Sequence, residues 1–202
     1  MPVGWPSHNE SRYHHVVSQI EEETETQESR PTARQLAALR QIRVMGDPAL
    51  REVATPVTVF DAELRATADR MIEVMHNAPG VGLAATQLGL MRRLLVYDVD
   101  DDARVLVNPQ ICERSQETEV EQEGCLSVPG VRVPVERAVR IRVTGRDVGG
   151  RPLDFAAEGI HARVIQHETD HLDGILIVDR TTKEERAEAM RLLRETVLSG
   201  DT

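Results

Sequence analysis

The stretch HETDH, residues 167–171, decides how this chain is interpreted. It lies in a segment, residues 159–173, that is predicted to be helical and to end at Gly174. Positions i and i+4 lie one turn apart on the same helix face, so both imidazoles can reach one metal ion at about 2.0–2.1 Å. Glu168 directly follows the first histidine, and its carboxylate can reach a water on that ion without being a ligand. The pattern predicts a metal-dependent hydrolase, with a pair of hydrogen-bonded structural histidines as the alternative.

A catalytic metal site needs a third protein ligand and one open position. Zinc proteases often take that ligand from a third histidine, but no histidine follows His171. The glutamates downstream lie on a predicted amphipathic C-terminal helix and are better explained as its solvated face. Cys125, within the segment EGCLS at residues 123–127, remains. A thiolate and two neutral imidazoles leave a divalent site with one net positive charge, so we expect Cys125, His167 and His171 to be the ligands.

Composition narrows the possible functions. The chain has 202 residues, of which 40% are apolar, and a formal net charge of −10. The acidic balance argues against sequence-independent binding to DNA, which needs a basic surface. No stretch of about 18 apolar residues predicts a membrane span, and no apolar leader is present, so we expect a cytoplasmic protein. The second cysteine, Cys112, is expected to be a buried small apolar residue in a strand.

The order of predicted elements indicates an α+β fold. Residues 61–77 carry an apolar stripe at helical spacing, made of Leu64, Ala68, Met71, Ile72 and Met75. Strand-like runs follow at residues 94–99, 105–108 and 139–143. We expect mostly antiparallel sheets that pack around the helix with the HExxH motif, followed by a C-terminal helix.

Three segments together resemble the motifs of bacterial peptide deformylases. They are GVGLAATQ at residues 80–87, EGCLS at 123–127 and QHETDH at 166–171, and the resemblance covers roughly residues 42–180. It implies a hydrolase that removes the formyl group from the N-formylmethionine of newly made polypeptides. It also implies one divalent metal ion, Fe(II), for which Zn, Ni or Co can stand in after purification.

Composition and periodicity, together with the extent of the resemblance, predict three parts of the chain, and the long acidic N-terminal part departs from the compact family pattern. Residues 1–31 are expected to be an acidic, flexible extension, and residues 32–180 the catalytic domain. Residues 181–202 are expected to form the amphipathic C-terminal helix and a tail. Ribosome contact is a further implication, although this helix carries no basic patch.

Residue roles follow from the resemblance together with the chemistry. Glu168 is expected to take a proton as hydroxide attacks the formyl carbon, and then to deliver it to the departing amine. The resemblance assigns stabilisation of the developing negative oxygen to the Gln87 side-chain amide and the backbone N–H of Leu126. Residues expected to bind the substrate are Val81, Gly82, Arg132, Ile160 and Val164.

Two other interpretations compete with this one. The first is a zinc protease of the HExxH type, which the missing third histidine disfavours. The second is a structural metal module without catalysis. Such modules usually have four protein ligands, and Glu168 would then have no explanation.

Overall fold

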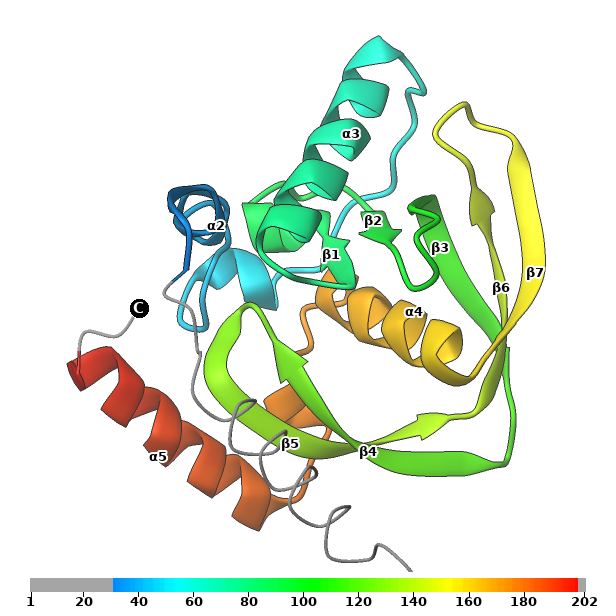
Figure 1. Ribbon diagram of the computed structural model, residues 1–202. Coiled ribbons are helices and arrows are strands. Elements are labelled where there is room, and N and C mark those ends of the chain that lie inside the picture. Colours follow the sequence, from blue (N-terminus) through cyan, green and yellow to red (C-terminus); the bar gives the residue numbers. More distant parts are fainter. Residues whose placement is uncertain (1–30, 200–202) are drawn as a thin grey trace, which may run out of the picture. The chain divides into compact units, whose positions relative to one another are not determined.

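The computed structural model describes residues 31–199, and the fold below is that of the compact unit Ala33–Thr202. Residues 1–30 of the predicted acidic extension and residues 200–202 of the predicted tail lie outside the described residues. The elements (Figure 1) are α2 (Ala33–Leu39), η1 (Pro48–Arg51), α3 (Ala62–Asn77), β1 (Gly82–Ala84), η2 (Ala85–Leu88), β2 (Leu94–Tyr97), β3 (Arg104–Arg114), β4 (Thr118–Cys125), β5 (Val128–Ala138), β6 (Arg140–Arg146), β7 (Pro152–Glu158), α4 (Gly159–Leu172), η3 (Ile177–Asp179) and α5 (Lys183–Ser199).

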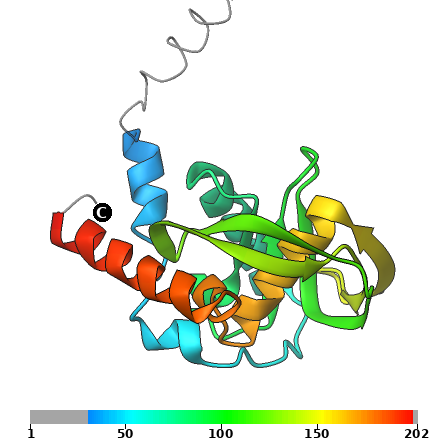
Figure 2. The same cartoon turned by 90° about the horizontal axis from the view of Figure 1, so that it is seen from below.

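The strands form two antiparallel sheets around one helix. A five-stranded sheet has the order β1-β2-β3-β6-β7, and β4 pairs with β5 in a second sheet. The helix α4, which carries HETDH, lies between the two sheets, and α5 packs against β5 (Figures 1 and 2). The α+β class and the arrangement of antiparallel sheets around a central helix are therefore confirmed.

The sequence of α3 explains its position. The Asp61 side chain caps the helix by accepting a hydrogen bond from Leu64 N at 2.9 Å. The predicted stripe faces the core, although Ile72 is only half-buried and Val74 takes a buried place that was not predicted. This face packs against β1 and β2, which fixes the edge of the five-stranded sheet that borders the functional site.

Helix α4 is buried on most of its surface, which is unusual for a helix with so many polar residues. Its apolar side chains, among them Ile165 and Leu172, join a cluster with Leu95 and Val143 of the five-stranded sheet. Its buried polar side chains are Arg163, Gln166, Glu168, Thr169, Asp170 and His171. Buried polar groups need hydrogen-bond partners, so the neighbours of α4 decide which polar residues it can carry.

The prediction for Cys112 is wrong. This residue is exposed on β3, and its Sγ lies 3.2 Å from Thr144 Oγ1. The pairing of β3 with β6 shifts register between Val107 and Gln110, and again between Ile111 and Glu113. Each bulge changes which side chains face the core, so the alternation that the apolar run suggested does not continue to Cys112.

The end of α4 depends on Gly174, which has a φ of +73°. A Cβ at this position would lie 2.7 Å from the Arg51 carbonyl oxygen, which belongs to the backbone and cannot swing away. Residue 174 therefore needs to be a glycine for two reasons: its backbone is left-handed, and it lies close to the backbone of η1. The helix ends where it was predicted to end.

We expect Gly174→Ala to destabilise the protein more than Gly159→Ala does. Gly159 also has a positive φ, +56°, but a Cβ there would meet nothing within 4 Å. The left-handed conformation alone costs an alanine roughly 1–2 kcal/mol. The additional clash at Gly174 should enlarge the loss in the free energy of unfolding, measured by urea denaturation. Equal losses in the two variants would show that the contact with Arg51 is unimportant.

Candidate metal centre

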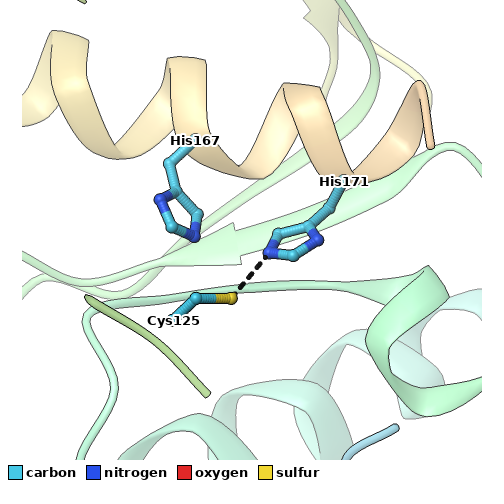
Figure 3. A group of neighbouring side chains, drawn as sticks. All are labelled: Cys125, His167 and His171. Atoms are coloured by element: carbon cyan, nitrogen blue, oxygen red, sulfur yellow. Dashed lines mark hydrogen bonds between the residues drawn. The ribbon is translucent and has the colours of Figure 1, made fainter. Parts of the chain in front are cut away.

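Three predicted ligands lie together. Cys125 is the last residue of β4, and His167 and His171 project from α4 towards it (Figure 3). Their potential ligand atoms all lie within 4.8 Å of one another. Cys125 Sγ is 3.2 Å from His171 Nε2, and the two imidazole centroids are 5.1 Å apart. Within residues 31–199, no other group of three or more histidine, cysteine or acidic side chains has this compactness.

The donor set fits a divalent ion. Burial raises the pKa of the Cys125 thiol, but the two neighbouring imidazoles more than offset this, and the pKa lies well below its ordinary value. The thiolate is the form that binds metals. His171 Nδ1 is buried without a hydrogen-bond partner. A thiolate and two imidazole nitrogens at this separation match the ligands and the open position of a catalytic site.

Glu123 holds His167 in place. Its Oε2 accepts a hydrogen bond from His167 Nδ1 at 3.0 Å, which leaves Nε2 of that ring free to face Cys125. Arg137 binds the same carboxylate through two nitrogens, at 3.0 and 2.9 Å, and Arg163 adds a contact at 2.8 Å. Burial raises the pKa of Glu123, but the hydrogen bonds from His167 and Arg137 hold it well below its usual range.

The network continues to the end of α4. Arg137 also pairs with Asp170, the fourth residue of HETDH, and Asp170 pairs with Arg180. Sequence reasoning did not assign a role to Glu123, Arg137 or Asp170. Strand alternation could have indicated Glu123, because residues two apart on β4 share a face and Cys125 is one of them. No local pattern indicates Arg137, which reaches the site from β5.

Glu168 lies beside the three ligands and is only 4% exposed. Burial raises the pKa of its carboxyl group. Its Oε2 has no hydrogen-bond partner, and its Oε1 lies so close to Gly82 that a Cβ there would overlap it. The side chain therefore sits against the backbone of β1 with one oxygen unused.

Gln87 has a fixed orientation. Its Oε1 accepts a hydrogen bond from Ala84 N at 2.8 Å, so its amide nitrogen points the other way. That nitrogen donates to Ser127 Oγ at 3.2 Å and lies 3.9 Å from Cys125 Sγ. Sequence reasoning did not single out Ser127, whose own backbone N–H donates to Cys125 Sγ at 3.4 Å.

One cleft of about 910 Å³ holds most of the predicted site. Its lining includes Cys125, His167, Glu168, Gln87, Leu126, Val81, Gly82, Arg132, Ile160 and Val164, whereas His171 lies beneath. Val81 and Ile160 are exposed, Val164 is buried, and Arg132 donates to Gln122 O at 3.0 Å. The structure thus brings together all the residues predicted for catalysis, metal binding and substrate binding.

The chain is similar to known proteins along most of its length. Residues 39–187 match the family model described as "Polypeptide deformylase". The chain belongs to the polypeptide deformylase family. A peptide deformylase of Acidothermus cellulolyticus is 48% identical over 165 residues, which are 82% of this chain and 91% of that protein.

Solved structures agree with this. A peptide deformylase from Legionella pneumophila superposes with a TM-score of 0.75 at 37% identity, and 79% of this chain and 96% of that one are covered. The peptide deformylase from Thermotoga maritima superposes with a TM-score of 0.69 at 50% identity, and 70% of this chain and 96% of that one are covered. The chain is therefore a metal-dependent hydrolase that removes the formyl group from formylmethionyl peptides, which confirms the resemblance and rejects both competing interpretations. Within residues 31–199 no helix is long and apolar enough to cross a membrane.

We expect Glu123→Gln to weaken metal binding by roughly 10- to 100-fold, because outer partners of a ligating histidine typically have effects of this size. Metal affinity would be measured by competition with a chelator. Glu121→Gln is the matched control, since Glu121 lies on the same strand and also pairs with Arg163 but is exposed. Equal affinities in the two variants would mean that the Glu123 contact does not hold His167.

Proposed function

We propose that Cys125, His167 and His171 hold one divalent metal ion, and that Glu168 moves the protons of the deformylation reaction. The observation that carries this is a buried carboxyl group with an unpaired oxygen beside a compact thiolate and imidazole cluster. When bound, the ion would polarise the formyl oxygen and lower the pKa of a water. We infer Fe(II) as the resident metal from the family resemblance, with Zn, Ni or Co able to replace it on the same ligands.

Glu168 would act twice. It would first accept a proton from the water that attacks the formyl carbon, and then give that proton to the nitrogen of the methionine as formate leaves. Burial raises the pKa of the Glu168 carboxyl group, which favours its protonated form, and this supports the second step. Its contact with Gly82 supports the placement, because the carboxylate has little room to turn away from the cleft.

Gln87 and Leu126 would stabilise the negative oxygen that develops during attack. The hydrogen bond from Ala84 N fixes the Gln87 amide so that its N–H groups point towards Cys125 and Ser127. The backbone N–H of Leu126 belongs to the turn that directly follows Cys125. Loss of one such donor typically costs about 2.7–4 kcal/mol of transition-state stabilisation.

The substrate would bind as an added strand. β1 lies at the edge of its sheet, with β2 as its neighbour, so a peptide can pair with the free side near Gly82. Val81 and Ile160 are exposed apolar residues that, with Val164, line the cleft and offer a place for the methionine side chain. Arg132 would attract a carbonyl or carboxylate of the peptide.

Two variants separate metal binding from proton transfer. Glu168→Gln keeps the shape of the side chain, so we expect normal metal content and a loss of formate release of about 10²- to 10⁴-fold. Cys125→Ser should instead lose the metal. Formate release from formyl-Met-Ala-Ser and metal analysis of anaerobically purified protein would be measured together. Full activity of Glu168→Gln, or unchanged metal content of Cys125→Ser, would contradict these roles.

The wider setting also follows as a proposal. We propose a cytoplasmic enzyme with an extension over residues 1–31, a catalytic domain over 32–180 and a C-terminal segment over 181–202. In that segment, α5 packs on β5 through Ala189 and Leu193. The family resemblance adds ribosome contact through the outer face of α5, where Arg191 is already paired with Glu188 and Glu195.

Co-sedimentation with ribosomes at low salt would check this contact. Because Arg191 is paired with Glu188 and Glu195, we expect its contribution to ribosome binding to be weak. Salt should abolish this binding, since exposed charges are screened beyond about a Debye length. Arg191→Glu should weaken this binding further. Equal sedimentation of the wild type and Arg191→Glu would place any ribosome contact elsewhere.

A further inference from the structure

The start of β1 depends on a hydrogen bond from a residue outside the cleft. β1 contains only three residues, Gly82–Ala84, and it lies at the edge of its sheet. Val81 precedes the strand, is 54% exposed and lines the cleft. Its carbonyl oxygen accepts a hydrogen bond from Asp98 N at 2.9 Å, which extends the pairing of β1 with β2 by one residue. Asp98 itself does not line the cleft.

That hydrogen bond orients the backbone that faces the free edge of β1. The carbonyl of Val81 and the N–H of Gly82 belong to one planar, trans peptide unit, so they point in opposite directions. Asp98 holds the carbonyl on the side of β2, and the N–H of Gly82 therefore points to the free edge. Gly82 lies opposite Tyr97 and next to this hydrogen-bonded pair, so its own carbonyl faces the free edge as well.

The side chain of Asp98 fixes where this backbone contact is made. Its Oδ2 accepts a hydrogen bond from His76 Nε2 at 2.9 Å, and its Oδ1 accepts one from Asp102 N at 2.9 Å. The side chain is only 14% exposed. His76 belongs to the last turn of α3, which ends beside β1 and β2 (Figure 1). The carboxylate therefore joins the end of α3 to the loop between β2 and β3.

The same end of α3 also holds the segment that leads into β1. Ala78 N and Gly80 N both donate to backbone carbonyls of α3, each at 2.9 Å. Val81 has no such direct bond and is held to α3 through Asp98 and His76. Loss of this connection would leave the peptide unit between residues 81 and 82 free to rotate, while the paired residues of β1 keep their places.

We propose that Asp98, held by His76, is a positioning residue that orients the edge of β1 at Gly82 for pairing with the peptide substrate. The inference rests on the proposed function, in which the substrate pairs with β1. Neither side chain lines the cleft, so both act through the backbone of Val81. Gly82 also belongs to the pairing of β1 with β2, so Glu168, which packs against it, should keep its place. Substrate binding should therefore suffer more than proton transfer.

Steady-state kinetics on formyl-Met-Ala-Ser separate these two effects. We expect Asp98→Ala to raise KM by roughly three- to tenfold, the effect of about one net hydrogen bond, and to leave kcat within about twofold. Asp100→Ala is the matched control. Asp100 lies on the same loop and accepts a hydrogen bond from His161 Nε2 at 2.8 Å, but its side chain is 67% exposed. Among the described residues no hydrogen bond joins Asp100 to β1, so both constants should stay unchanged.

Two variants of His76 test the other half of the contact. His76→Leu removes the donor and should raise KM in the same direction as Asp98→Ala. His76→Gln keeps an N–H donor and should return KM towards the wild-type value. The His76 side chain is 48% exposed, so both variants should fold even if Asp98→Ala does not. A merely structural role would lower the amount of active enzyme, and hence the apparent kcat, without a change in KM.

Three results would overturn the positioning role. They are an unchanged KM in folded Asp98→Ala, an equal rise of KM in Asp100→Ala, or the same KM in His76→Leu as in His76→Gln. Metal content would be measured for every variant, so that loss of the ion is not mistaken for loss of binding. Failure of the proposed function gives a different result, because metal-replete wild type would then release no formate from the peptide.

Discussion

The carboxylate of Glu123 joins the strand that carries one proposed metal ligand to the helix that carries the other two. It accepts a hydrogen bond from His167 and forms ion pairs with Arg137 and Arg163. All four side chains have little exposure to solvent. Buried charges are costly unless they are paired, and removal of one partner leaves the others uncompensated. These buried contacts therefore fix the position of β4 relative to α4. In this position Cys125 lies opposite the two histidines.

The same constraint explains how a polar helix can lie in the core. Arg137 extends from Glu123 to Asp170, and Arg180 completes the pairing of Asp170. Gln166 is satisfied separately, by the backbone of Ala138. Three buried atoms of α4 have no hydrogen-bond partner: Glu168 Oε2, Thr169 Oγ1 and His171 Nδ1. The proposed role of Glu168 therefore depends on its position beside the ligand cluster and not on the unpaired oxygen alone.

Much of the site could be predicted because its residues are close in sequence or carry recognisable spacing. The i, i+4 histidines of HETDH fix two positions on one helix face, and the helix end at Gly174 was correct. Glu123 and Arg137 were not assigned, since their roles depend on how β4 and β5 pack against α4. Cys112 was predicted to be buried and is exposed, because two register shifts in β3 break the alternation that its sequence suggests.

X-ray absorption spectroscopy at the metal edge of anaerobically purified protein would show which side chains bind the ion. We predict one sulfur ligand near 2.3 Å and two imidazole ligands near 2.0–2.1 Å, typical values for such sites. One open position should remain for exchangeable oxygen ligands. A metal shell without sulfur, or with two sulfurs, would contradict a centre built from Cys125, His167 and His171.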